Sequence, residues 1–228
     1  MVQSLTFEVP GQGPVRLDLR RALAAGYTGR DRALVQEHID ELAHLGVAPP
    51  KHVPMLFPLI PTLVTFARHI AVLGFDSTPE VEVALFRAGG ADYVGLGSDH
   101  TDRKVEAASI PLAKNVCPKP VAPVAWPVAE VAAHWDRLVL RSACEGVPLQ
   151  EGPLAKIMPR DDLLAFVAIH DGPDHEGRMV FSGTVPTQAQ PPRRGEPSEL
   201  APLDPGSGPR IAHAYSVLAV TELFARCA

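Results

Sequence analysis

The sequence has few cysteines and no long basic run. Only three cysteines occur among 228 residues, Cys117, Cys144 and Cys227, and no two of them form a Cys-x-x-Cys pair. An odd number of widely spaced cysteines suits a reducing compartment and provides no zinc or redox motif. No run of lysine and arginine exceeds two residues and the net charge is −5. A nucleic-acid partner is therefore excluded.

Long apolar runs are also missing. No segment combines a basic stretch with an apolar run of signal-peptide or membrane-spanning length, so we expect a cytoplasmic protein without a membrane partner. The sequence has no Gly-x-Ser-x-Gly elbow to expose a serine nucleophile and no glycine loop to bind phosphate. Serine hydrolases and nucleotide-binding enzymes are thereby disfavoured.

Proline is abundant, and this abundance shapes the expected fold. Apolar residues make up 46% of the chain and charged residues 21%, which is typical of a packed domain. The length suits one generous domain rather than two independent cores. With 24 prolines and 18 glycines, long helices are disfavoured, and we expect short strands joined by many turns.

Hydrophobic periodicity predicts the elements in order. We expect a hairpin over residues 1–30, a helix over 31–45 ending at Gly46, strands over 80–86, 93–97, 138–144, 147–150 and 179–185, and a short helix over 161–167 capped by an acidic residue. Residues 54–73 suggest a linker followed by a short strand or helix, and residues 211–228 suit either a closing strand or a helix. The proline-rich residues 186–209 predict a long mobile loop.

Two glutamates on the strand over 80–86 point to a metal site. Glu80 and Glu82 are two residues apart on one strand face, so their Cα atoms lie roughly 6 to 7 Å apart. Like charges buried side by side favour protonation, and a divalent cation removes that penalty. Asp99, at the end of the next strand, is the natural third ligand. Hard oxygen ligands of this kind favour Mg²⁺, Mn²⁺ or Ca²⁺.

Simpler interpretations exist for this motif and for a second acidic cluster. A Glu-x-Glu pair on a strand is more often a solvated outer face. The ionisable residues between His170 and Glu176 could form another metal site, but Gly172, Pro173 and Gly177 favour a turn.

The order of these motifs resembles the catalytic half of the fumarylacetoacetate hydrolase superfamily, over about residues 75 to 190. The features that carry the resemblance are the Glu-x-Glu strand, the strand ending at Asp99, the basic Arg103 and the later Lys114. Further features are the strand and turn over 141–150, the helix near 161–164 and the Gly-Thr pair at 183–184. The runs over 97–103 and 117–120 look most like a branch of that superfamily carried as a domain of unknown function.

The resemblance implies specific roles. Glu80, Glu82 and Asp99 would hold Mg²⁺ or a similar ion, and Lys114 would contact the substrate. Gln150, Gly183, Thr184 and Arg103 would be substrate-binding, although Arg103 also suits an ion pair behind the site. His100 could act as a general base, because the ordinary pKa of histidine lies near neutrality, or it could point away from the ion.

The resemblance also implies a fold and an activity. The expected fold is α+β and mostly β, with a small α+β segment over residues 1–70 and, over 71–228, a β-roll or distorted barrel of mixed sheets. The expected protein is a homodimer and a divalent-metal-dependent hydrolase cleaving a carbon–carbon bond in a small oxo acid or β-dicarbonyl compound.

Two alternatives to hydrolysis stay open. Many relatives carry an Asn-Tyr followed by a histidine that activates water, and residues 51–58 lack that pattern, although His52 and His69 lie nearby. This departure favours a lyase of the same family, such as a decarboxylase, hydratase or dehydratase of 2-oxo acids. The other alternative is a non-catalytic protein that binds a small anionic ligand.

Overall fold

The computed structural model describes residues 2–44, 46–188, 198–201 and 210–221. Its strands are β1 (Gln3–Val9), β2 (Gly13–Leu19), β3 (Arg21–Gly26), β4 (Met55–Leu59), β5 (Val64–Thr65), β6 (His69–Val72), β7 (Ser77–Thr78), β8 (Val81–Ala88), β9 (Ala91–Ser98), β10 (Thr101–Asp102), β11 (Lys119–Pro127), β12 (Val139–Cys144), β13 (Val147–Pro153), β14 (Arg178–Phe181), β15 (Ser198–Ala201) and β16 (His213–Ala219). The α-helices are α1 (Arg32–His44), α2 (Arg103–Glu106), α3 (Ile110–Asn115), α4 (Val128–Val131) and α5 (Arg160–Asp171), and the 3-10 helices are η1 (Pro61–Leu63), η2 (Ala132–Arg137) and η3 (Leu154–Lys156).

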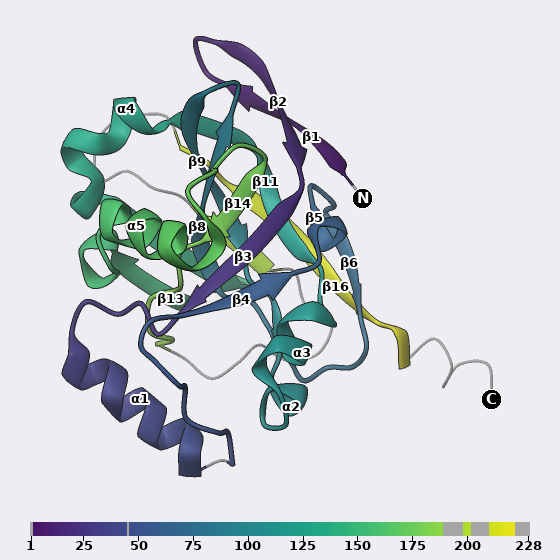
Figure 1. The fold of residues 1–228 in the computed structure, drawn as a ribbon. Helices are drawn as coiled ribbons and strands as arrows, with labels where there is room; N and C mark the ends of the chain where they lie inside the picture. The colour runs from purple at the N-terminus through teal and green to yellow at the C-terminus, as the bar shows by residue number, and fades with distance from the viewer. Residues whose placement is uncertain (1, 45, 189–197, 202–209, 222–228) are drawn as a thin grey trace.

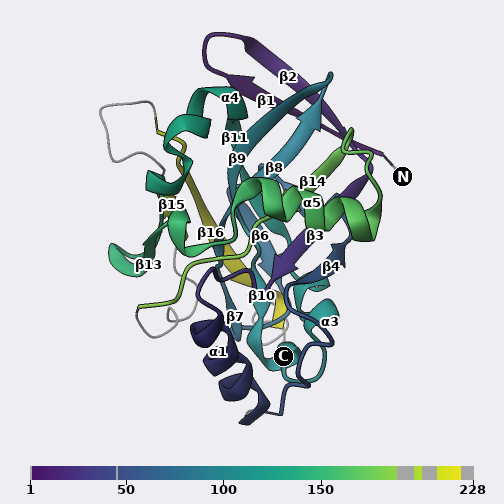
Figure 2. The same cartoon turned by 60° about the vertical axis from the view of Figure 1, so that its left-hand side comes forward.

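Two large mixed sheets dominate the described part of the chain. The larger runs in the order β2-β1-β11-β9-β8-β14-β3-β4, with β5 paired to β11, and the smaller runs β13-β12-β15-β16-β6. Helix α5 lies against the larger sheet in front of β8 and β14, while α2 and α3 lie together at one end (Figure 1). Figure 2 shows β13, β15 and β16 of the smaller sheet beside the larger one. The mostly β architecture of mixed, curled sheets is confirmed.

Strand β8 is buried on both faces, and its two faces belong to different cores. Val83 and Leu85 pack with one apolar cluster that also contains Leu163 and Val167 of α5. The alternate residues Ala84 and Phe86 pack in the other cluster. The side-chain period of two explains this division. A polar side chain on such a strand must therefore have a hydrogen-bond or charge partner within the protein, or bind a ligand.

Strands on either side of residue 70 share the larger sheet. Strand β3 pairs in parallel with β14, and β1 pairs in parallel with β11. The boundary between a segment over 1–70 and a domain over 71–228 stays a prediction. Among the described helices, none has both the length and the apolar character needed to cross a membrane.

Most elements expected from periodicity are confirmed. The hairpin is β1 and β2, and the helix over 31–45 is α1. Residues 54–73 hold β4, η1, β5 and β6. In the segment over 211–228, His213–Ala219 form strand β16, and residues 222–228 lie outside the described residues. Within the predicted loop over 186–209, residues 189–197 and 202–209 lie outside the described residues. Residues Ser198–Ala201 form strand β15, so that part of the loop prediction is wrong, because β15 pairs with β12 and β16.

Two details of the predictions are corrected. Helix α5 begins after Pro159, whose side chain cannot accept a hydrogen bond from the helix, so the prediction of an acidic capping residue is wrong. Asp161 and Asp162 lie inside the first turn instead, where their negative charges interact favourably with the helix dipole. Strand β14 ends at Phe181, before the expected residue 185. Gly183 adopts a φ of 86°, which takes the chain out of the strand.

Candidate metal centre

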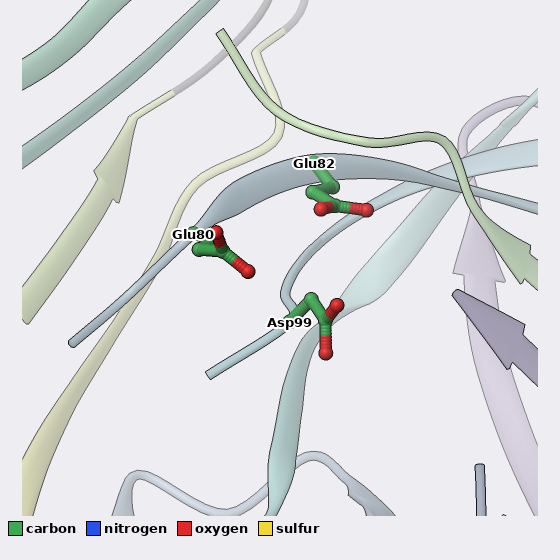
Figure 3. Close-up of side chains that lie close together, drawn as sticks. All are labelled: Glu80, Glu82 and Asp99. Atoms are coloured by element: carbon green, nitrogen blue, oxygen red, sulfur yellow. The ribbon is translucent and has the colours of Figure 1, made fainter. Parts of the chain in front are cut away.

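The pairing of β8 with β9 brings three carboxylates together. Val81 at the start of β8 pairs with Ser98 at the end of β9, so the residues that flank this pair, Glu80 and Asp99, become neighbours. The Asp99 amide donates a hydrogen bond to the Glu80 carbonyl, 3.0 Å away. One ligand oxygen from each of Glu80, Glu82 and Asp99 lies within 4.8 Å of the others. Figure 3 shows the three carboxylates around one common space.

The cluster is buried rather than solvated. Glu82 is 2% exposed and Asp99 is 1% exposed, while the Glu80 side chain is 16% exposed. A solvated outer face, the simpler interpretation of the Glu-x-Glu pair, does not fit this burial. Buried carboxylates need compensating charge or protonation.

Among the three carboxylates, Glu82 has the fewest interactions that would stabilise its negative charge. The Gly183 amide donates a hydrogen bond of 2.8 Å to its Oε2. Burial raises the pKa of Glu82 well above its usual range, and the negative charges of Asp99 and Glu80 add to that rise. A cation between the three carboxylates would relieve this repulsion.

Glu80 has two basic neighbours. Arg103 at the start of α2 lies 3.0 Å from its Oε1, and Lys114 on α3 lies 3.3 Å from its Oε2. Burial opposes ionisation of Glu80, but Arg103 and Lys114 outweigh it and hold the pKa of Glu80 well below its usual range. Arg103 also contacts Glu106 at 2.8 Å, so its guanidinium is an ion-pair partner behind the cluster. A role for Arg103 in substrate binding stays a prediction.

Lys114 enters the cluster from helix α3, which Ser109 caps by accepting from the Leu112 amide. Its Nζ lies 2.5 Å from Asp99 Oδ2 and 5.8 Å from the centre of the Phe57 ring. Burial lowers the pKa of Lys114, but the carboxylates of Asp99 and Glu80 raise it more, so the net shift is upward. The side chain is thus a charged ammonium within the acidic cluster.

Lys119 is a second lysine at the cluster, and the sequence interpretation assigned it no role. It opens strand β11 and is completely buried. Its Nζ lies 2.9 Å from Asp99 Oδ1 and donates to the His100 carbonyl at 2.5 Å. A lone lysine at the head of an otherwise apolar strand, a few residues after Lys114, was the signal available in the sequence.

His100 turns away from the carboxylates. Its Nδ1 lies 3.0 Å from the Tyr215 hydroxyl, and its Nε2 lies 3.0 Å from the Ser77 hydroxyl. Burial lowers the pKa of His100 to about 3, helped by the positive charges of Lys119 and Arg103. Its role as a general base stays a prediction, and it would require one of the two hydroxyl contacts to open.

Gln150 and Thr184 connect the start of β8 to the segment after β14. The Gln150 carbonyl oxygen accepts from the Val81 amide at 3.0 Å, and its Nε2 donates to Thr184 Oγ1 at 2.7 Å and to the Val185 carbonyl at 2.8 Å. Thr184 donates to the Val81 carbonyl at 2.7 Å. Both Nε2 hydrogens of Gln150 are thus used within the protein. The predicted contacts of Gln150 and Thr184 with substrate stay predictions.

The second acidic cluster, over residues 170–176, forms the turn that its glycines favoured. Gly172 ends α5 with a φ of 86°. Asp171 pairs with the buried Arg178 at 2.7 Å, and Glu176 accepts from the amides of Gly89 and Gly90. Asp171 and Glu176 therefore serve separate partners. Within the described residues, only Glu80, Glu82 and Asp99 form a group that could hold a metal ion.

The residues of the cluster fit a hard divalent cation. All three donors are carboxylate oxygens, the ligand type that Mg²⁺, Mn²⁺ and Ca²⁺ prefer. Asp99 Oδ1 is buried and receives no hydrogen bond from the described residues, although the Lys119 ammonium lies close to it. Lys114 sits between Asp99 and Glu80, so an ion on these oxygens requires its ammonium to shift.

Comparison by sequence identifies one family. The sequence profile described as protein of unknown function DUF2848 matches residues 25–215. No curated protein matches the chain.

Solved structures share the fold at low identity. A provisionally named fumarylacetoacetate isomerase/hydrolase from Oleispira antarctica superposes with a TM-score of 0.70 at 18% identity, over 93% of this chain and 99% of that one. Fumarylpyruvate hydrolase from Pseudomonas aeruginosa, solved with Mn²⁺ and pyruvate, gives a TM-score of 0.65 at 16% identity, over 96% of each chain. A yeast fumarylacetoacetate hydrolase family protein gives 0.64 at 12% identity, over 88% and 94%.

Proposed function

From the premise that this chain belongs to the DUF2848 family of proteins of unknown function and has the fumarylacetoacetate hydrolase fold, we propose that it is a divalent-metal-dependent hydrolase. It would cleave a carbon–carbon bond in a small oxo acid or β-dicarbonyl compound. One observation carries the proposal: three carboxylates, two of them almost fully buried, meet within 4.8 Å beside the ammonium of Lys114.

Glu80, Glu82 and Asp99 would hold Mg²⁺, Mn²⁺ or Ca²⁺, with Mg²⁺ as the first choice. A bound ion of this kind supplies Lewis-acid polarisation of a substrate carbonyl. The Gly183 amide keeps Glu82 in place, and Arg103 keeps Glu80 in place. This arrangement orients the carboxylates before substrate arrives.

Lys114 would contact the substrate directly. Its Nζ reaches Asp99 Oδ2 and Glu80 Oε2, so a small shift would present the ammonium to an oxygen bound in the same space. A fixed positive charge in a buried site stabilises an enolate or carboxylate oxygen more strongly than water does. The Pseudomonas aeruginosa protein was crystallised with Mn²⁺ and pyruvate, a 2-oxo acid, which supports this substrate class.

A second candidate is a lyase that decarboxylates, hydrates or dehydrates a 2-oxo acid. The surroundings of two histidines support it. The His52 ring lies 6.3 Å from that of His170, and His69 Nδ1 lies 2.6 Å from the Ser216 hydroxyl. Each of the two rings thus lies beside a residue that is not one of the three carboxylates. The third candidate, a non-catalytic binder of a small anion, would use the same cluster.

Turnover assays separate the candidates. The purified protein is incubated with acylpyruvates and with 2-oxo-3-deoxy sugar acids, each with Mg²⁺ and with Mn²⁺. Cleavage of acylpyruvates supports the hydrolase, and conversion of the sugar acids supports the lyase. Metal binding without either turnover supports the binder. The homodimer and the cytoplasmic location stay predictions. Light scattering of the purified protein would check whether it is a dimer.

A further inference from the structure

Lys119 adds a positive charge to the acidic cluster from a position that no substrate can reach. It is completely buried, and its ammonium lies 2.9 Å from Asp99 Oδ1. On the other side of the same carboxylate, Lys114 lies 2.5 Å from Oδ2. Asp99 is therefore held between two ammonium groups, and each takes one of its oxygens.

Local structure fixes the position of Lys119. Strand β11 pairs with β9 through Val121 and Gly97, which places its first residue beside the end of β9. A Cβ at Gly97 would lie 2.7 Å from a methyl group of Val121 and 3.1 Å from the Pro120 carbonyl. This close approach of the strands brings the Lys119 ammonium to the His100 carbonyl, 2.5 Å away. The ammonium is tied to backbone as well as to Asp99.

The charge count shows what a second ammonium does. Three carboxylates face two lysines, while Arg103 is shared between Glu80 and Glu106. A divalent ion then leaves the loaded centre with one net positive charge, and without Lys119 that charge would be zero. A buried positive charge weakens cation binding and strengthens anion binding, and it strengthens the binding of a doubly charged anion most.

We propose that Lys119 is a positioning residue that weakens metal binding and in return gives the loaded centre its preference for a doubly charged carboxylate ligand over a singly charged one. This inference rests on the proposed function, because it concerns the same centre. Lys119 acts through Asp99 and through its charge rather than by touching the ligand.

The test measures two affinities that a merely structural role would change in the same direction. Lys119→Gln removes the charge and keeps an N–H donor for the His100 carbonyl. Titration calorimetry gives the affinity of wild type and variant for Mn²⁺, and then of the Mn²⁺-loaded forms for oxalate and for pyruvate. We expect Mn²⁺ to bind about tenfold more tightly to the variant. Oxalate should bind about tenfold more weakly, with a smaller loss for pyruvate.

Two controls accompany the variant. Lys51→Gln removes the same charge from an exposed lysine and should reproduce the wild-type affinities. Lys119→Met gives the same charge change with a side chain suited to burial, and it replaces the glutamine variant if circular dichroism shows that the latter is unfolded. In wild type itself, oxalate should bind more tightly than pyruvate.

The outcomes are distinct. Mn²⁺ and oxalate affinities that both fall, or both stay unchanged, in the Lys119 variant overturn the inference and leave the proposed metal centre standing. The same holds if wild type binds oxalate no more tightly than pyruvate. A wild-type protein that does not bind Mn²⁺ overturns the proposed function and this inference with it.

Discussion

The acidic cluster at the end of β9 and the turn after α5 have similar compositions and opposite arrangements. Each contains several ionisable residues, the cluster beside the paired strands β8 and β9 and the turn within residues 170–176. At the end of β9, three acids turn their oxygens into one space. In the turn, Asp171 and Glu176 face different partners. Convergence of like charges, rather than their density in the sequence, distinguishes the acidic cluster from the turn, because only convergence creates repulsion that a cation relieves.

The largest effect is expected from the cluster itself. Glu82→Gln removes one carboxylate oxygen from the three, and we expect the affinity for Mn²⁺ to fall about 100-fold or more, since loss of even an outer partner costs up to about 100-fold. The variant should fold, because the pKa of Glu82 is already raised and a glutamine oxygen can still accept from Gly183. Calorimetric titration with Mn²⁺ measures the change.

The matched control is Glu176→Gln in the turn, which should leave the Mn²⁺ affinity unchanged. Equal losses in both variants would contradict the division between the two regions.

Each of the two regions contains a glycine with a positive φ. Gly183 beside the cluster and Gly172 in the turn both have a φ of 86°. A Cβ at Gly183 would lie 2.0 Å from Thr28 Oγ1, whereas a Cβ at Gly172 meets nothing within 4 Å. We expect Gly172→Ala to cost about 1 kcal/mol from φ alone. Gly183→Ala should cost about 3 kcal/mol, because crowding adds to that strain.

Denaturant unfolding of the two alanine variants gives both values. If the two variants lose similar amounts of unfolding free energy, the structure around Gly183 accommodates an added methyl group without further cost.

The turn should matter for stability alone. Asp171 accepts from the buried Arg178 at 2.7 Å, so Asp171→Asn removes a charged partner, and we expect the free energy of unfolding to fall by about 1 to 3 kcal/mol. Affinity for Mn²⁺ should equal that of wild type. An Asp171→Asn variant with weakened Mn²⁺ binding would show that the turn and the acidic cluster are coupled.

The smallest effect concerns pH. The pKa of Glu82 is raised in the folded protein above its ordinary value of 4.5, so its proton stabilises the metal-free fold below pH 4.5 and that contribution is lost as pH rises through the folded pKa. Between pH 4.5 and the pKa of Glu82 in the folded protein, we expect the free energy of unfolding of the metal-free protein to fall as the pH rises, by at most about 1.4 kcal/mol per pH unit.

Urea unfolding at several pH values, with Glu82→Gln as reference, isolates this contribution. An identical pH dependence in wild type and variant would remove Glu82 as its source.

The sequence predicted much of the local structure, since period-two alternation and turn residues act over a few positions. Strand β8, the turn at Gly172 and helix α1 followed from such patterns. The acidic cap of α5 did not, because the chain entering the helix places Pro159 at the cap position. The early end of β14 was missed because it depends on close packing of Gly183 against Thr28.

Strand periodicity and the pairing of consecutive strands are local rules, so the amino-acid sequence alone was enough to select the three acids on and beside two neighbouring strands. Long-range packing is needed to explain why Lys119 is buried against Asp99, why His100 faces Tyr215 and Ser77, and why Gln150 uses its amide within the protein. These facts depend on β11, β16 and the segment after β14, which meet the cluster from distant parts of the chain, and no local pattern encodes which neighbour each polar group finds.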